Sequence, residues 1–338
     1  MMEPDVTGYL FPNDVHIMWS LMIVLYPYIT GLVAGAFIVS SLYHVFGRHE
    51  LRPVARLSLV ASLAFLLVAT LPLLVHLGHP ERSLNIIVTP HFSSAMAAFG
   101  LVYTVYLLLV TLEIWLVYRK DIILLARRSR GIKRWFFATV ALGVYDTSEE
   151  ALAVDHKTIV ILASLGIPAA CILHGYVGFM FGSVKANYWW STPLMPIIFL
   201  FSAVTSGVAL IMVLYQSLMV LSAKRINAEC VQSISRWLWL FVIVTVSMEL
   251  LEITTLAYER SEEWLVIGPL LSTKLAFSFI GVQMVFGSLI PILLLGIVVL
   301  MRPYLTDPLR NTIAFLASLI LLIQVFAMRW NVVIGGQI

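Results

Sequence analysis

Residues 193–222 read PLMPIIFLFSAVTSGVALIMVLYQSLMVLS and contain no charged side chain. A helix needs about 20 mainly apolar residues to cross the roughly 30 Å hydrocarbon core of a bilayer, so this stretch is long enough to do so. Similar apolar runs recur along the chain, with short gaps between them. Of the 338 residues, 61% are hydrophobic and 12% are charged, which is more apolar surface than one globular core can bury. The sequence therefore predicts an all-α integral membrane protein that cannot fold as a soluble domain.

The apolar runs predict about eight transmembrane helices, which form one transmembrane domain over residues 1–338. Spans one to four and five to eight are expected to form two four-helix bundles. Residues 1–15 are acidic and lack the basic start of a signal peptide, so the first span is expected to remain in the protein. The expected spans are 15–46, 54–78, 92–118, 156–182, 193–222, 231–258, 270–300 and 309–328.

The distribution of Lys and Arg predicts which loops face the cytoplasm, because cytoplasmic loops carry these residues in excess. If the N-terminus is outside, the outer segments hold only Arg82, Lys185, Arg260, Lys274 and Arg329. The inner segments then hold 16 of the 21: Arg48, Arg52, Arg56, Arg119, Lys120, Arg127, Arg128, Arg130, Lys133, Arg134, Lys157, Lys224, Arg225, Arg236, Arg302 and Arg310. We therefore expect both termini to be extracytoplasmic.

The longest interruption between spans is residues 119–155. Its basic run at 127–134 is typical of a cytoplasmic anchor near anionic lipid, and the formal net charge of +3 reflects sidedness and does not indicate nucleic-acid binding. Residues 135–154 are apolar but contain Asp146, Glu149 and Glu150. Because a ninth span here would reverse every later loop, we expect a helix that lies on the inner surface or packs against a partner.

The two cysteines, Cys171 and Cys230, are too few for a four-thiolate iron–sulfur site. They are expected near opposite membrane faces, so no disulfide is expected between them. Electron carriers, if electrons pass through this protein, are therefore expected on another subunit, and no metal of its own is predicted.

Polar residues from four spans are expected in the outer leaflet, where an ionisable side chain usually marks a ligand site or a proton path. An apolar crevice with a few fixed hydrogen-bonding groups is what a quinone needs, because its carbonyls require hydrogen bonds and its reduction requires protons. The candidates for contacting a quinone are Asn13, His16, His76, His174 and Tyr176.

Glu249 and Glu252 lie on one face of the sixth span and, together with Asp14, are predicted to relay protons. The loop groups Glu81 and Arg82 would then lead to bulk water. The structural alternatives are that the two span carboxyls only bridge helices, that Asp14 caps the first helix, and that the loop groups are simply solvated. In the inner half, Glu113 either extends toward water or takes part in proton transfer.

Several segments together carry a family resemblance: LGHPERSLN (77–85), TPHFSSAM (89–96), the segment beginning VDHKTIV at 154 that continues through spans four and five, and MRWNVVIGGQ (328–337). They resemble the NrfD/PsrC family, the quinone-interacting membrane subunits of multi-subunit oxidoreductases, and the resemblance covers nearly the whole chain. Within the family, GIPAACILHGYVGF (166–179) and RWNVVIGGQ (329–337) favour the DsrP-like branch of sulfur metabolism.

The resemblance implies that Asn13, His16 and Tyr176 hold the headgroup of menaquinone or another quinone. His174 departs from the polysulfide-reductase pattern and resembles the branch that serves sulfate-reducer complexes, hydrogenases and alternative quinol oxidoreductases. His174 and Tyr176 are about 200° apart on an ideal helix, so which of them faces the quinone stays open.

The resemblance also implies partners and a location. The partners would be an extracytoplasmic ferredoxin-like iron–sulfur subunit and further catalytic or cytochrome subunits, in the cytoplasmic membrane of a prokaryote that respires anaerobically.

Three other functions are compatible with the sequence. A secondary transporter or ion-translocating subunit would use midplane charges or broken helices, and a passive anchor would only tether soluble subunits. A b-type cytochrome would need facing histidines at equal depth, for which the candidates are His16, His76 and His174 at one face and His44 and His156 at the other.

Overall fold

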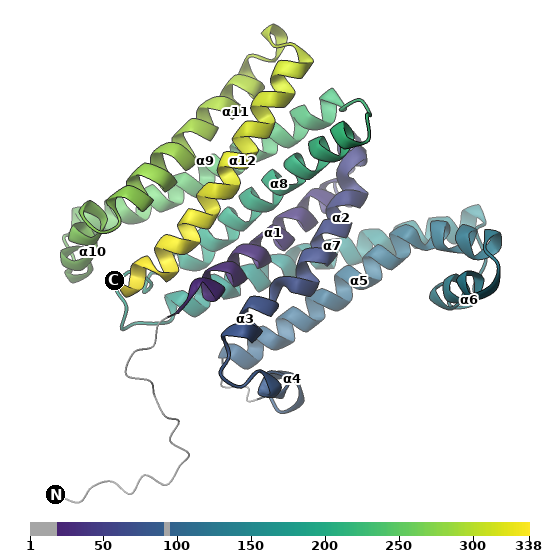
Figure 1. Ribbon diagram of the computed structural model, residues 1–338, viewed down its shortest axis with the longest axis horizontal. Coiled ribbons are helices and arrows are strands. Elements are labelled where there is room, and N and C mark those ends of the chain that lie inside the picture. The colour runs from purple at the N-terminus through teal and green to yellow at the C-terminus, as the bar shows by residue number, and fades with distance from the viewer. Residues whose placement is uncertain (1–18, 91–94) are drawn as a thin grey trace, which may run out of the picture.

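The computed structural model describes residues 19–90 and 95–338, and the regular structure in these ranges is helical. Eight of its helical segments are long and apolar enough to cross a membrane, which confirms the expected all-α membrane fold. These segments are α1 (Leu21–His44), α2 (Arg52–Ala69) with α3 (Leu71–His76), α5 (Ala95–Arg128), α7 (Glu149–Gly182), α8 (Met195–Leu221), α9 (Ala228–Glu259), the π-helical η3 (Ala276–Leu289) with α11 (Ile290–Leu300), and α12 (Asp307–Val333) (Figure 1).

Shorter elements connect the spans. They are η1 (His49–Leu51), η2 (Pro80–Arg82), α4 (Asn85–Val88), α6 (Gly131–Val140), α10 (Glu262–Ser272), η4 (Arg302–Tyr304) and η5 (Gly335–Gln337).

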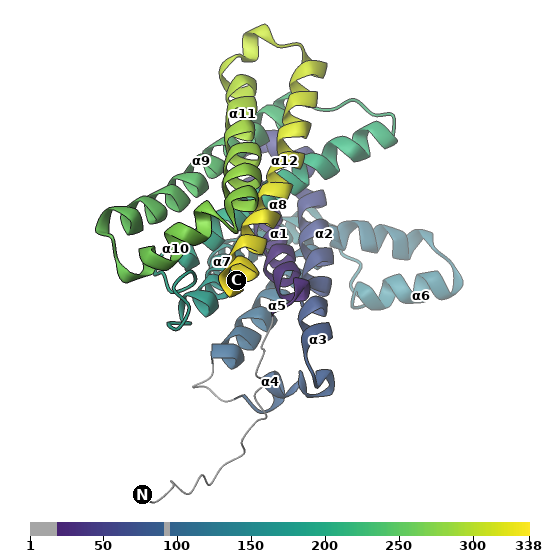
Figure 2. The same ribbon diagram turned by 60° about the vertical axis from the view of Figure 1, so that its left-hand side comes forward.

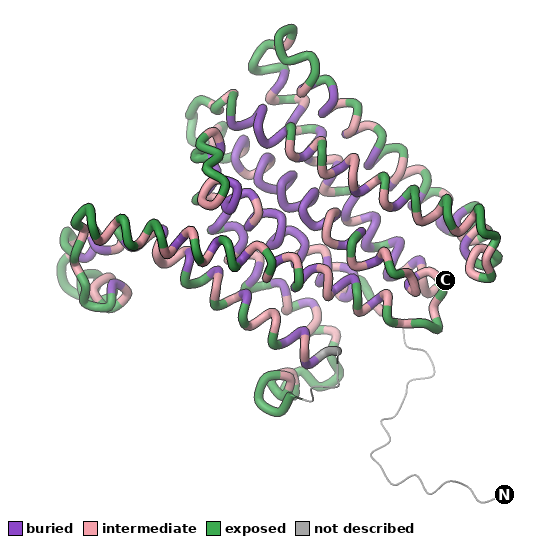
Figure 3. Tube along the Cα trace, turned by 180° about the vertical axis from the view of Figure 1, so that it is seen from behind, coloured by how far each residue is buried: buried purple, intermediate pink, exposed green. Residues whose placement is uncertain are grey.

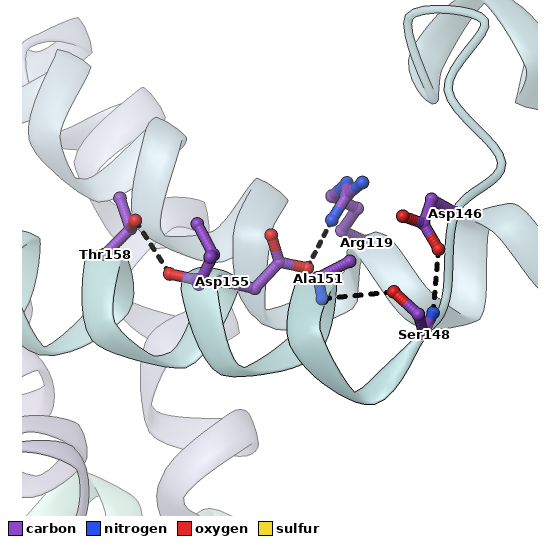
Figure 4. A network of polar contacts seen from close by, with 7 residues as sticks. Arg119, Asp146, Ser148, Ala151, Asp155 and Thr158 are labelled. Carbon is purple, nitrogen blue, oxygen red and sulfur yellow. Dashed lines mark hydrogen bonds and ion pairs between the residues drawn. The ribbon is translucent and has the colours of Figure 1, made fainter.

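α5 and α7 each extend well beyond one predicted end of their spans. α5 continues to Arg128 instead of ending at 118, and α7 begins at Glu149 instead of 156. The prediction ended both helices where charged residues begin, but a helix that projects beyond the bilayer can carry charges on its surface. Arg119 of α5 forms an ion pair with Asp155 of α7, and the Ser148 hydroxyl caps α7 by accepting a hydrogen bond from the Ala151 amide at 3.2 Å (Figure 4).

The centre of the fold is the contact between α1 and α8. In the apolar parts of these two helices 72% of the residues are buried, more than in any other described span, and the buried residues gather in the middle of the bundle (Figure 3). A Cβ atom on Gly207 would lie 2.4 Å from the Cα atom of Gly35, so the two backbones approach more closely than any side chain allows. Small residues make such contacts possible in membranes, where hydrophobicity does not drive helices together.

The two ends of the bundle differ. We call one end the C-terminal face: it holds the start of α1, the end of α3, residues 183–194, α10 and the C-terminus (Figure 1). There the backbone amide of Trp19 donates to the side-chain oxygen of Gln337 at 2.7 Å, and Lys274 Nζ donates to the backbone oxygen of Ile338 at 2.5 Å. The opposite end holds α6, which stands apart from the other helices beside the far end of α5 (Figures 1 and 2).

We predict that the C-terminal face is extracytoplasmic. A membrane-impermeant maleimide should label Asn85→Cys in intact cells and Arg128→Cys only after permeabilisation, because both positions are exposed but lie at opposite ends of the bundle. Labelling of the parent chain supplies the background, since Cys171 is partly buried and Cys230 is buried, and both are free thiols. The reverse pattern would place the C-terminal face in the cytoplasm.

Candidate functional site

A cavity of about 410 Å³ lies at the C-terminal face between α1, α3 and α7. We call it the α1 cavity. Most of its wall is apolar, as at Ile23, Leu73 and Val177, and two polar aromatic side chains of different chemistry, His76 and Tyr26, also line it. An apolar pocket with a few polar groups is the usual form of a small-molecule site.

The polar groups of the α1 cavity have unused hydrogen-bonding capacity. The hydroxyl group of Tyr26 is buried and has no hydrogen-bond partner among the described residues, although a buried tyrosine hydroxyl normally finds one. Nδ1 of His76 lies 3.2 Å from the hydroxyl oxygen of Ser20, which leaves the other ring nitrogen available. A polar ligand in the cavity could bond the His76 imidazole directly, and it would reach the buried Tyr26 hydroxyl after the tyrosine side chain turned toward it.

A second cavity, of about 240 Å³, lies between α9, η3 and α12 at the same end. We call it the α9 cavity. Glu249 and Glu252 both line it, so the structure brings these two carboxyls to one space. Gln283 donates to Glu249 Oε2 at 2.9 Å and accepts from the Asn331 amide at 2.8 Å. The other Glu249 oxygen and the Asn331 oxygen are buried without a partner in the described part of the chain, so acceptors remain free here.

His174 is buried at a third place, in a polar cluster around Arg329. One Arg329 nitrogen donates to the hydroxyl of Ser202 at 2.7 Å and to the backbone oxygen of Phe199 at 3.1 Å, and lies 3.2 Å from His174 Nε2. The guanidinium carbon lies 3.7 Å from the centre of the Phe199 ring, a cation–π contact. Ile198 and Met328, which are next to Phe199 and Arg329 in sequence, line the α9 cavity, so this cluster lies beside that cavity.

Two stacked tryptophans stand between the two cavities. The Trp19 and Trp190 rings are stacked at 4.7 Å. Trp19 lines the α1 cavity, and Trp190 donates to the backbone oxygen of Val332, which lines the α9 cavity. The single outer cluster predicted from sequence is therefore divided among the α1 cavity, the α9 cavity and the Arg329 cluster.

The remaining predicted site residues lie elsewhere. Tyr176 is partly buried, with its ring 5.4 Å from that of Phe179, whereas His174 is fully buried. Asn13, Asp14 and His16 lie outside the described residues.

In the loop after α3, His79 and Glu81 form an exposed ion pair of 2.9 Å. The Glu81 backbone amide and the His79 ring both donate to the Glu81 carboxylate and lower its pKa. Glu81 is thus a solvated carboxylate near neutral pH, and Arg82 beside it is also exposed.

Glu113 does not extend to water. It is fully buried in α5, and neither of its carboxylate oxygens has a hydrogen-bond partner among the described residues. Of the two alternatives for this residue, reaching water is inconsistent with its burial, and proton transfer stays a hypothesis.

Sequence reasoning missed three residues of the cavities and misplaced one cation. Tyr26, Gln283 and Asn331 were not singled out, because an uncharged polar residue in an apolar run resembles ordinary packing. Arg329 was counted among the outer loop cations, but it lies inside α12 and is fully buried. The error has a simple cause: the last span was expected to end at 328, and the helix continues to Val333.

The surroundings of His174 do not suit a haem ligand. Nε2 faces the Arg329 cation, and a Cβ atom on Gly31 would lie only 3.3 Å from the His174 ring, which leaves no room for a macrocycle on that side. Among the described residues, no three His, Cys, Asp or Glu side chains gather as a metal site would require.

Comparison with known proteins identifies the family. The model of the polysulphide reductase NrfD family matches residues 12–338, and the chain belongs to this family of integral membrane proteins. It is 30% identical to a selenate reductase subunit of Mesobacillus selenatarsenatis, over 95% of this chain and 74% of that protein.

Two further relatives match a smaller part. The chain is 31% identical to a putative dimethyl sulfoxide reductase membrane subunit of Halobacterium salinarum, over 58% of this chain and 42% of that protein. It is 23% identical to protein NrfD of Escherichia coli, over 58% of this chain and 59% of that protein.

Proposed function

We propose that this protein is the quinone-binding membrane subunit of a multi-subunit oxidoreductase. It exchanges electrons between the quinone pool, with menaquinone as the first candidate, and an extracytoplasmic iron–sulfur partner. Membership of the NrfD family and the names of two relatives, both of them reductase subunits, support a role as one part of a larger complex. The observation that carries the proposal is the α1 cavity with the unpartnered hydroxyl of Tyr26.

The α1 cavity suits a quinone headgroup. The two carbonyl oxygens of a quinone accept hydrogen bonds, and the two hydroxyl groups of a quinol donate them. The Tyr26 hydroxyl can do either, and so can the imidazole of His76 through its available nitrogen. The apolar wall accommodates the ring, and Asn13 and His16, which the family resemblance implies as headgroup contacts, precede α1 directly in sequence.

Proton transfer accompanies the electron transfer. Oxidation of one quinol releases two electrons and two protons, and reduction of one quinone takes up the same number. His76 is placed to exchange a proton with the headgroup, since it lines the cavity near the C-terminal face. We assign Glu249 and Glu252 to proton relay beside the site, with Asp14 as a further member, because an apolar environment otherwise offers protons no titratable carrier.

The electrons leave or arrive through the partner. No redox metal is assigned to this chain, so the iron–sulfur subunit must dock close enough to the α1 cavity to accept electrons directly. The C-terminal face is the surface for this contact, because the cavity lies at that end of the bundle. Further catalytic or cytochrome subunits would determine the terminal substrate, with sulfur compounds as candidates.

Tyr26→Phe should weaken quinone binding by about 5- to 150-fold, the effect of losing one good hydrogen bond of about 1 to 3 kcal/mol. Fold stability should hardly change, because the lost hydroxyl has no protein partner among the described residues. Tyr28→Phe is the matched control: Tyr28 lies on the same helix but donates to the Leu322 backbone oxygen at 3.2 Å. The measurement is quinone titration of the purified protein, and equal affinity in both variants would contradict the site.

Glu249→Gln and Glu252→Gln should each slow quinol-dependent turnover of the complex by about 100-fold or more, the lower end of the range for loss of a proton-transferring group. Quinone affinity should be nearly preserved, since neither residue lines the α1 cavity. Glu229→Gln, an exposed change in the first turn of the same helix, is the control. If the carboxyls only bridge helices, the amide replacements should retain both the turnover and its dependence on pH.

A further inference from the structure

The segment that projects at the end opposite the C-terminal face has features that the proposed function does not use. α5 is 34 residues long, or about 51 Å at 1.5 Å per residue, which exceeds the roughly 30 Å core of a bilayer. Its last turns therefore project beyond the hydrocarbon core. We call residues 119–155, comprising the end of α5, α6 and the start of α7, the inner arm.

α6 folds back along α5 toward the bundle. The Trp115 indole on α5 donates to the backbone oxygen of Val140 at the end of α6, at 2.8 Å. Trp115 lies 13 residues before the end of α5 at Arg128, which corresponds to about 20 Å along the helix. α6 therefore runs back from the tip of the inner arm to the level where α5 enters the bundle.

Polar contacts hold the base of the inner arm in place. Arg119 pairs with Asp155, and the Ser148 amide donates to Asp146 Oδ1 at 2.8 Å (Figure 4). Nearer the tip, Arg127 donates to the backbone oxygen of Tyr145 at 2.6 Å. These contacts connect α5, the segment after α6, and α7. They fix the positions of the two elements between which α6 lies in sequence.

α6 carries an apolar face that no described residue covers. Ile132 is 86% exposed, Trp135 70% and Phe136 55%. On an α-helix Ile132, Trp135 and Phe136 share one face, because residues three and four apart are neighbours. α6 contacts α5 mainly through its second half, where Phe137, Ala138 and Val140 are partly buried.

Exposed cations surround this apolar face, and the chain around them contains no acidic residue. Residues 122–145 contain no Asp or Glu, and five exposed cations lie between 127 and 134: Arg127, Arg128, Arg130, Lys133 and Arg134. None of the five forms an ion pair within the described part of the chain. Glu149 and Glu150 lie in the first turn of α7, where the helix dipole favours negative charge. Asp146 precedes that helix and interacts electrostatically with Arg127.

We propose that α6, which itself carries Lys133 and Arg134, and the three arginines just before it bind the anionic headgroups of the inner membrane leaflet. A helix with aromatic residues on one face and Lys or Arg beside it lies in the membrane interface, where tryptophan is enriched. The exposed apolar surface of α5, where Leu108 is 58% and Leu112 50% exposed, continues along that helix toward α6. The exposed cations, the aromatic face of α6 and this apolar surface of α5 together fit an anionic bilayer surface.

Lipid titration tests the proposal. The full-length chain in detergent is titrated with phosphatidylglycerol, and bound lipids are counted by native mass spectrometry, with phosphatidylcholine as the zwitterionic reference. Lys133→Gln/Arg134→Gln should weaken phosphatidylglycerol binding by roughly 5- to 25-fold at low salt, because each such cation near an anionic surface contributes a factor of about five. Lys185→Gln/Arg260→Gln removes the same charge from exposed positions at the C-terminal face, away from the inner arm, and should leave the binding unchanged.

A spin label tests the position of α6 independently. A nitroxide at Ile132→Cys, in nanodiscs with anionic lipid, should collide with oxygen more than with a water-soluble nickel complex, and a label at Lys224→Cys should show the opposite preference. Signal from the parent chain is subtracted. Water-like access at position 132, or equal phosphatidylglycerol binding in the two double variants, would overturn the proposal and leave α6 as a surface for a soluble protein.

Discussion

The backbone contact between Gly35 of α1 and Gly207 of α8 is the constraint on which the rest of the fold depends. Neither position can hold a Cβ atom without displacing backbone on the other helix. With α1 and α8 this close, α2, α7 and α12 can all pack on α1, and α7, α9 and α12 on α8. The same face of α1 presents Gly31 to the His174 ring. The close contact therefore fixes α1, and with it Tyr26, relative to the helices that form both cavities.

A bilayer supplies no water to buried polar groups, so each must be satisfied by protein or by a ligand. One terminal nitrogen of Arg329 shows the first solution, because a backbone oxygen, a hydroxyl and an imidazole surround it and the guanidinium group lies over an aromatic ring. Nε of the same group has no partner among the described residues. The hydroxyl of Tyr26 and the free oxygens of Glu249 and Asn331 show the second, since they are buried without a partner among the described residues. In our account a quinone forms a hydrogen bond with the Tyr26 hydroxyl, and exchangeable protons bind the Glu249 carboxyl.

The sequence was sufficient for the fold because the determining signal, long apolar runs, is local. It placed helix ends less well: charged residues such as Arg119 and Asp155 look like loop residues until they pair across two helices. The site was predicted in part. Glu249 and Glu252 do line one cavity, because spacing along one helix is enough to predict a shared face. The separation of His76, His174 and the two glutamates could not be predicted, since it depends on which helices meet. Tyr26 could not be distinguished from Tyr28 in sequence, because only the packing decides which hydroxyl finds a partner.

The central claim is that the quinone headgroup occupies the α1 cavity. The most direct test is photoaffinity labelling of the full-length protein with an azidoquinone, followed by peptide mapping of the crosslinks. The account predicts crosslinks in α1 near Tyr26, in α3 near His76 and in α7 near Val177, all of which line the cavity, and their loss when excess unlabelled quinone competes. Competable crosslinks confined to α9, η3 and α12 would place the headgroup in the α9 cavity and contradict the account.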